Sequence, residues 1–167
     1  MDFFQTVFAR QSTRAFSAER LPKESLQKIL AAGCAAPVGR GAYGNLRLTV
    51  LQKPALLEKI SAATGGDKAG APLYGAPTLI LVSSPASNNL EYANAACVVE
   101  NMHLAATALG LGSVYLWGFL RVFSDAALLA ELGLPEGFRP VSALGAGYAV
   151  ESKERKPAPG IETSYIR

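Results

Sequence analysis

The sequence has little charge, a single histidine and only two cysteines, and each shortage limits what the chain can do. Charged side chains make up 17% of its 167 residues, against about 25% in a typical soluble domain. Its histidine and cysteines form no cluster with the spacing of a metal site. The net charge of +3 comes without a long basic stripe, which argues against nucleic acid as a partner. So little surface charge indicates that part of the surface is hidden by oligomerisation.

The two cysteines are typical of a reducing compartment. Cys34 and Cys97 lie among alanines in expected helices, without CxxC spacing, and the first ten residues do not resemble a signal peptide. We therefore expect buried, reduced thiols and a cytoplasmic location. The length favours a single domain over residues 1–167.

The longest apolar stretch with helical character spans residues 90–110, and the other elements are expected to pack around it. Apolar or small side chains fall on almost every side of this helix, as in a helix covered on most faces. Asn94, Glu100, Asn101 and His103 interrupt the run, so it lacks the roughly 20 apolar residues that cross a bilayer. We expect no membrane association, and a partner subunit would complete the cover.

The rest of the chain mixes helices and strands. Helices are predicted at residues 2–9, 22–36, 54–63 and 124–132, the last capped by Ser124 and closed by Gly133. Strands are predicted at residues 46–50, 77–84, 112–118 and 140–150, and the continuous run at 77–84 suits a strand buried on both faces. This order places the fold in the α/β or α+β class, around a small sheet.

Three glycines match a dinucleotide-binding fingerprint but lie in the wrong context. Gly39, Gly41 and Gly44 form G-x-G-x-x-G, a motif that works only where it leaves a strand and opens a helix. Here a helix that ends at Pro37 precedes the glycines, and an expected strand follows them. The glycines therefore serve to bend a loop or to let the backbone approach a flat ligand.

Two short basic clusters are candidates for binding a phosphate. Arg10, Ser12 and Arg14 alternate in an expected loop, so their side chains would project to one side. Guanidinium forks and a hydroxyl match phosphate oxygens, although a loop of this composition is also typical of a solvated surface. Lys153 and Arg155 repeat the alternation after the last expected strand. If that strand returns them to the first loop, the two clusters together would hold a dianion.

Several stretches in the same order resemble the nitroreductase family of flavin enzymes, in particular its shorter members. They are FARQSTRAF, ILAAGCAAP, APTLILV, NAACVVENMHLAATALGLGSVYLWG and LGLPEGFRPVSALGAGYAVESKERKP. The resemblance covers nearly the whole chain. It implies an α+β homodimer with a small, mainly antiparallel sheet, long central helices packed across the interface, and a flavin mononucleotide (FMN) in each of two interfacial sites.

The resemblance also assigns residues to the cofactor. Arg10 and Ser12 match positions on the phosphate, Arg14 a position near the ribityl chain or the pyrimidine edge, and Lys153 with Arg155 the carboxy-terminal phosphate pair. The backbone of residues 115–118 would lie along the isoalloxazine, with the Gly118 amide donating to N5, while the Trp117 side chain alone is equally typical of a core residue. The expected cofactor-binding set is Arg10, Gln11, Ser12, Arg14, Pro37, Val38, Gly39, Leu116, Trp117, Gly118, Lys153 and Arg155.

The sequence departs from the family pattern in residues 37–45. Many members have a serine after the alanine-proline pair and an Asn/Gln-containing loop, where this chain has Val38 followed by Gly-Arg-Gly-Ala-Tyr. In such a dimer this loop would come from the other subunit, and Arg40 or Tyr43 would shape the open face of the flavin. His103 is expected to be a satisfied interface histidine and not a catalytic acid, and no metal is expected.

The implied chemistry belongs to the flavin, so no catalytic side chain is assigned. NADH or NADPH would deliver hydride to N5 and leave, and a small electron-poor acceptor such as a nitroaromatic or quinone would then occupy the same place, which predicts ping-pong kinetics. Two alternatives remain open: a flavin carrier or sensor without turnover, and an FMN enzyme dedicated to a dehalogenation or dehydrogenation step.

Overall fold

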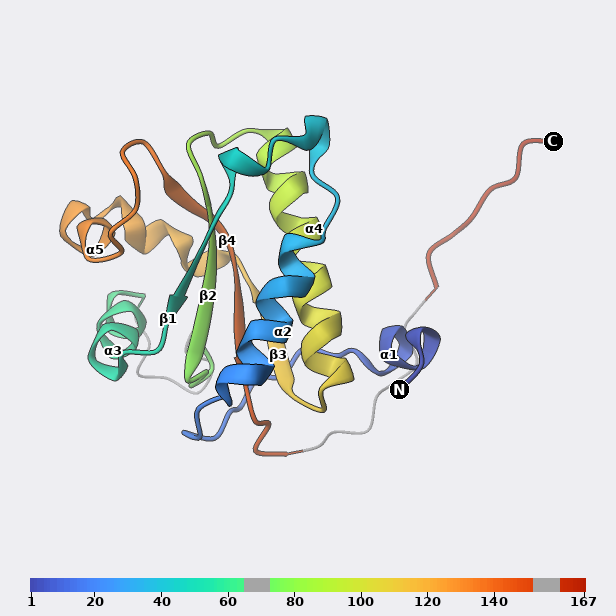
Figure 1. The fold of residues 1–167 in the computed structure, drawn as a ribbon, viewed down its shortest axis with the longest axis horizontal. Coiled ribbons are helices and arrows are strands. Elements are labelled where there is room, and N and C mark those ends of the chain that lie inside the picture. Colours follow the sequence, from blue (N-terminus) through green and yellow to red (C-terminus); the bar gives the residue numbers. More distant parts are fainter. Residues whose placement is uncertain (65–72, 152–159) are drawn as a thin grey trace.

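The computed structural model describes residues 1–64, 73–151 and 160–167. Within these residues, the centre is a four-stranded sheet in the order β1-β2-β4-β3 (Figure 1). Each neighbouring pair of strands is antiparallel. The strands are β1 (Arg47–Leu51), β2 (Thr78–Ser84), β3 (Gly112–Leu116) and β4 (Arg139–Gly147). The expected α+β class with a small, mainly antiparallel sheet is confirmed.

Helices cover both faces of this sheet, which divides the interior into two cores. On one face lie α2 (Lys23–Cys34) and α4 (Asn89–Ala108), side by side in Figure 1. On the other face lie α3 (Pro54–Ala63), the 3-10 segment η3 (Gly118–Ser124) and the short α5 (Ala126–Ala130). β2 faces both cores, because the side chains of a strand alternate between its faces. Ile80 and Leu81, on opposite faces, are both 0% exposed, as the continuous apolar run predicts.

The central helix forms close to its predicted bounds. The Asn88 side chain caps it by accepting a 3.0 Å hydrogen bond from the Glu91 backbone N–H. Its buried residues pack against α2 and the sheet, but the other side chains are exposed or half-exposed in the single chain, among them a stripe of Ala93, Ala96, Cys97, Glu100, Leu104 and Ala108. The chain therefore covers only part of α4 and leaves a broad face open. No helix among the described residues has the length and apolarity to cross a bilayer.

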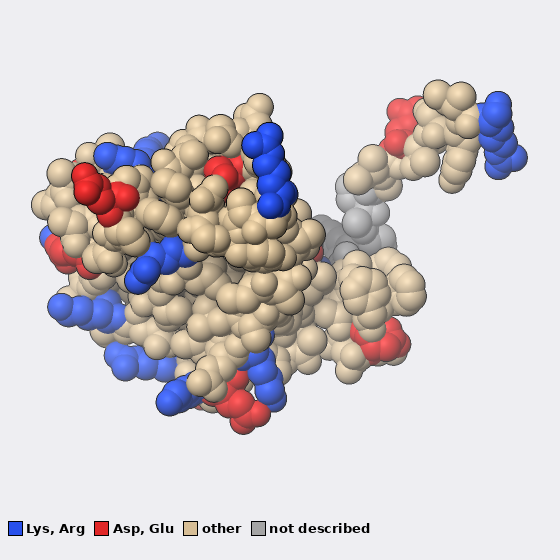
Figure 2. Space-filling view, turned by 45° about the horizontal axis from the view of Figure 1, so that its top comes forward, with Lys and Arg blue, Asp and Glu red and all other residues tan. Residues whose placement is uncertain are grey.

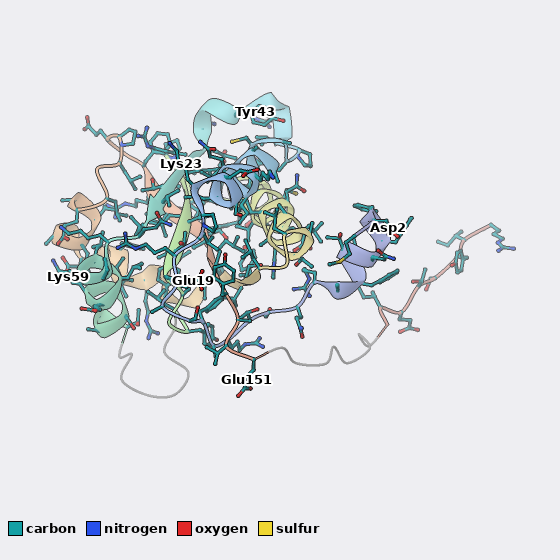
Figure 3. The ribbon with its side chains drawn as sticks, turned by 60° about the horizontal axis from the view of Figure 1, so that its bottom comes forward. Asp2, Glu19, Lys23, Tyr43, Lys59 and Glu151 are labelled. Atoms are coloured by element: carbon teal, nitrogen blue, oxygen red, sulfur yellow. The ribbon has the colours of Figure 1, made fainter. Side chains whose placement is uncertain are left out.

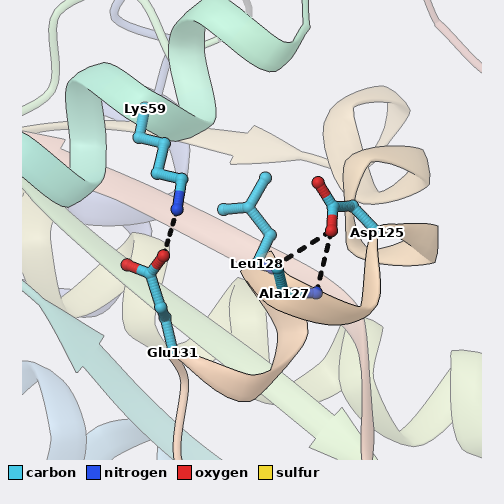
Figure 4. Close-up of polar contacts among 5 residues, drawn as sticks. All are labelled: Lys59, Asp125, Ala127, Leu128 and Glu131. Atoms are coloured by element: carbon cyan, nitrogen blue, oxygen red, sulfur yellow. Dashed lines mark hydrogen bonds and ion pairs between the residues drawn. The ribbon is translucent and has the colours of Figure 1, made fainter.

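Two local predictions are wrong. Asp125 and not Ser124 caps α5, because its carboxylate accepts a 2.8 Å hydrogen bond from the Ala127 backbone N–H (Figure 4). The Ser124 hydroxyl instead donates to the Arg121 carbonyl inside η3. The same figure shows the ion pair between Lys59 and Glu131, which joins α3 to the chain beyond α5.

The other correction concerns Cys34, which is exposed and not buried, while Cys97 is half-buried. The reason lies in its neighbour. A Cβ on Gly33 would lie 2.7 Å from Cγ of Met102, so α2 meets α4 through this glycine. A helix turns about 100° per residue, and Cys34 therefore points away from the contact.

Large apolar side chains at both ends of the chain are uncovered. α1 (Phe3–Ala9) presents Phe3, Phe4 and Phe8, each at least 65% exposed. Residues 160–167 extend away from the body in Figure 1 and expose Ile161, Tyr165 and Ile166. On the face drawn in Figure 2, charged side chains are scattered between wide areas without charge. This face thus keeps the low charge of the composition.

Candidate functional site

The predicted phosphate loop leaves α1 and joins the outer edge of β3. Arg10 ends α1, and Ser12 then pairs with Ser113 in a short parallel bridge. The Thr13 backbone N–H donates to the Ser113 carbonyl over 2.9 Å. A Cβ on Gly112 would lie 2.8 Å from Oγ1 of Thr13, so a glycine is required for this close approach. The loop is therefore fixed to the sheet by backbone contacts.

The Arg10 guanidinium is held by the central helix. Its Nη1 lies 3.0 Å from Nε2 of His103, and Nδ1 of the same ring lies 2.5 Å from Oγ of Ser113. Because a guanidinium can only donate, Nε2 must be the acceptor. We therefore assign the ring proton to Nδ1, which donates to Ser113. The three residues form a relay from the loop through α4 to β3.

His103 is uncharged at neutral pH. Its side chain is 2% exposed. Burial and, after it, the charge of Arg10 lower its pKa to about 4. Both ring nitrogens have partners, as expected for a satisfied histidine. A neutral ring whose Nε2 accepts from Arg10 has no proton to give there, which is contrary to the role of a catalytic acid.

A cavity of about 460 Å³ opens beside this loop. Its lining includes residues 11–15, residues 110–112 at the start of β3, and Tyr148, Ala149 and Glu151 just after β4. The two stretches of chain are tied together, since the Val150 N–H donates to the Ala15 carbonyl over 3.1 Å. Within the described residues, no group of three or more His, Cys, Asp or Glu side chains is placed to hold a metal ion.

The cavity brings together part of the predicted set. Gln11, Ser12 and Arg14 line it, whereas the guanidinium of Arg10, between the lining residues 9 and 11, is directed to His103. Lys153 and Arg155 lie outside the described residues. The chain does reach this cavity at Glu151, two residues before the first of them.

The segment expected along the isoalloxazine lies at the far end of β3. The Leu116 side chain is 5% exposed and belongs to the core, so only its backbone can face a ligand. Trp117 is 60% exposed and packs edge-on against Tyr92 with ring centroids 6.1 Å apart. The alternative of a core tryptophan is therefore wrong for the described chain. Gly118 is exposed, and a Cβ there would meet nothing within 4 Å.

The outer edge of β3 connects these two ends. β3 is the last strand of the sheet, and Ser113 uses its outward carbonyl to bind Thr13. Alternate residues of a strand present their N–H and C=O groups to the same side, so those of Tyr115 face the same edge. No strand among the described residues pairs with this edge beyond the bridge at Ser113. It offers backbone donors and acceptors to a ligand.

Pro37, Val38 and Gly39 lie at the end of the molecule opposite the phosphate loop. The Gly39 N–H donates to Oδ1 of Asn94 over 2.8 Å, and this turn continues into η1 (Gly39–Gly41) and η2 (Tyr43–Asn45). Figure 3 places Tyr43 at one end of the body and Glu151 at the opposite end. Within one chain, the structure therefore does not bring these three residues to the phosphate loop.

Sequence reasoning missed the partners of Arg10. Ser113 is a polar residue between the buried Gly112 and Val114, and a buried hydroxyl needs a hydrogen-bond partner. A polar residue inside an apolar strand is therefore a usable signal for a polar contact, but it does not identify His103 as the partner.

Comparisons with known proteins decide the family. A model described as the nitroreductase family matches residues 7–68 and 63–148. The chain belongs to the nitroreductase family. A relative from Archaeoglobus fulgidus, provisionally named NADH dehydrogenase/NAD(P)H nitroreductase, is 30% identical over 153 residues, which cover 89% of this chain and 86% of the relative.

Solved nitroreductases share the fold. A nitroreductase with bound FMN from Bacteroides fragilis is 29% identical, with a TM-score of 0.84 over 99% of this chain and 100% of the other. A second, from Desulfitobacterium hafniense, is 23% identical with a TM-score of 0.87 over 98% and 97% of the two chains. The nitroreductase-like fold therefore extends over the described chain.

Proposed function

We propose that this nitroreductase-family chain is an FMN-dependent oxidoreductase that takes electrons from NADH or NADPH. Its acceptors would be small electron-poor molecules such as nitroaromatics or quinones. The observation that carries the proposal is the outer edge of β3, which has no strand partner among the described residues beyond the bridge at Ser113. This edge joins the cavity beside the phosphate loop to the exposed end at Trp117 and Gly118. The bound FMN of the B. fragilis relative supports the choice of cofactor.

The phosphate end of the proposed site is formed by the loop and its surroundings. Ser12 and Arg14 line the cavity, Arg10 adjoins it, and Lys153 and Arg155 follow Glu151 in sequence. The positive charges of Arg10, Arg14, Lys153 and Arg155 would outweigh the negative charge of Glu151. The guanidinium groups suit a dianionic phosphate. The residues present therefore fit this part of FMN.

The ring end of the proposed site lies along β3. Residues 112–117 span about 16 Å at roughly 3.3 Å per residue, which suits an elongated ligand with a phosphate at one end and a flat ring at the other. The backbone groups of Tyr115 face the outer edge, and Gly118 leaves space beside the strand end. We assign to the Gly118 amide the role of donor to N5.

Bound FMN would supply hydride acceptance and donation at N5. The chain itself contributes orientation: the loop anchors the phosphate, the strand edge aligns the ring, and Trp117 with Tyr92 forms an aromatic border at the ring end. One open face would serve donor and acceptor in turn, which is the basis for proposing ping-pong kinetics.

We further propose that the functional unit is a homodimer. The open stripe of α4 is rich in small residues, and α1 exposes three phenylalanines that water would otherwise surround. Residues 37–39 lie at the opposite end from the phosphate loop of their own chain (Figure 3). A second subunit would cover the apolar faces and would bring its own residues 37–45 to the flavin.

Anaerobic titration tests the function. The purified protein should bind FMN, lose the long-wavelength flavin absorption when NADH or NADPH is added, and recover it when a nitroaromatic or quinone follows. Steady-state double-reciprocal plots should give parallel lines. Bound flavin that neither dinucleotide bleaches would favour a carrier or sensor. Bleaching without turnover of these acceptors would favour a dedicated dehalogenation or dehydrogenation enzyme, and failure to bind FMN would refute the proposal.

A further inference from the structure

Arg10 is anchored by an uncharged group, which is unusual for an arginine that is held in place. Fixed guanidinium groups in proteins are commonly paired with carboxylates, which supply both position and opposite charge. Here the partner is Nε2 of His103 at 3.0 Å. The ion pairs found in the described part of the chain involve Lys28 with Glu24 and Lys59 with Glu131. The positive charge of Arg10 is therefore not balanced by any of these carboxylates.

The contact with His103 accounts for one nitrogen of the Arg10 guanidinium. A guanidinium has five N–H donors in a fixed plane, and the contact with His103 uses Nη1. Ser113 keeps the ring in the required orientation by accepting from Nδ1 at 2.5 Å. Thr107, one turn beyond His103 on α4, lines the cavity, as do the residues on either side of Arg10. Arg10, His103 and Ser113 thus adjoin residues of the cavity lining without being part of it.

We infer that His103 is a positioning residue for anion binding: its neutral imidazole fixes the Arg10 guanidinium beside the cavity without cancelling its charge. This inference rests on the proposed FMN site. A carboxylate at position 103 would hold Arg10 equally well but would compete with the ligand phosphate. An aliphatic residue there would leave the long arginine side chain free to adopt other rotamers. Only a neutral acceptor both fixes the position of the guanidinium and leaves its positive charge uncompensated.

The test compares two ligands that differ by the phosphate. The ratio of the riboflavin Kd to the FMN Kd isolates the phosphate contribution, because general damage to the fold affects both ligands. We expect His103→Leu to lower this ratio roughly tenfold and His103→Glu to lower it at least as much, since both disturb a charge-assisted contact. His103→Gln keeps a neutral acceptor and should stay within about threefold of the wild type. Riboflavin binding should change little in all three.

A double-mutant cycle shows whether His103 acts through Arg10. In an Arg10→Ala background, His103→Leu should leave the ratio unchanged, because the group that it positions is gone. An unchanged or raised ratio in His103→Leu alone would overturn the inference, as would an equal loss in both backgrounds. Should His103→Leu fail to fold, the comparison of His103→Gln with His103→Glu decides in the same way.

The outcomes also separate this inference from the proposed function. A large wild-type ratio that Arg10→Ala abolishes but His103→Leu does not would refute only the role of His103. A wild type that binds FMN no better than riboflavin would refute the phosphate site and this inference with it.

Discussion

Acidification should destabilise the fold through His103. The ring is buried and neutral, and its pKa is lowered to about 4 from the ordinary histidine value of 6.5. Between these values the unfolded chain binds a proton that the folded chain does not. The free energy of unfolding therefore rises with pH across this window and falls as pH decreases through it. The full effect of the shift is about 3 kcal/mol, at roughly 1.4 kcal/mol per pKa unit.

The size of the effect at an accessible pH can be worked out. From pH 7 to pH 5, the histidine should contribute a loss of about 2 kcal/mol, or roughly 4–8 °C in Tm for a chain of this size. His103 is the only histidine in the sequence, and unperturbed carboxylates titrate mainly below pH 5. The decline in this interval should therefore be due mainly to one residue.

Urea denaturation at pH 7, 6 and 5 measures this decline, with FMN kept in the same excess. The matched control is His103→Gln, which cannot titrate but keeps a neutral acceptor for Arg10. Between pH 7 and pH 5, its free energy of unfolding should fall by about 2 kcal/mol less than that of the wild type. Parallel declines in the two proteins would show that His103 is not held neutral by the fold, which would contradict its contacts with Arg10 and Ser113.

Three further predictions concern other parts of the chain. Arg155→Ala should weaken FMN binding roughly ten- to hundredfold while riboflavin binding barely changes; equal losses for both ligands in equilibrium titrations would contradict a phosphate role. Gly147→Ala should destabilise the protein by about 1–3 kcal/mol, because a Cβ there would lie 2.7 Å from Cδ of Pro77. The control is Gly44→Ala, where a Cβ would meet nothing within 4 Å, and thermal melting compares the two variants. Cys34 should react with a thiol reagent faster than the half-buried Cys97, and the reverse order by mass spectrometry would indicate that a partner covers Cys34.

The main elements of the fold could be predicted because their signals are local. β2 is a continuous apolar run that follows Gly75 and Pro77 and ends in serines, and α4 combines a capping asparagine with twenty residues of helical character. The start of α5 was misplaced by one residue because Ser124 and Asp125 are both good capping residues. Which of the two accepts the helix N–H groups depends on the path of the preceding η3 segment.

The site was predicted less completely because its contacts connect distant parts of the chain. Arg10 and His103 are 93 positions apart, and no local spacing relates them. The alternating spacing and the family resemblance both indicated Arg10, Ser12 and Arg14, but neither gave a partner for Arg10. The exposure of Trp117 depends on the point at which β3 ends, and an apolar residue at a strand end can face either way.

The outer edge of β3 has a consequence for the protein without its ligand. Unpaired strand edges are sites where chains join one another into larger aggregates, and proteins usually protect them with charge, bulges or covering segments. Beyond Ser113 the described chain offers this edge no strand partner, and the exposed Tyr115 and Trp117 adjoin it. A flavin bound along β3 would also cover that edge and hinder its pairing with another chain. We therefore expect the supply of FMN during synthesis to govern how much of the protein stays in solution as well as how much of it is active.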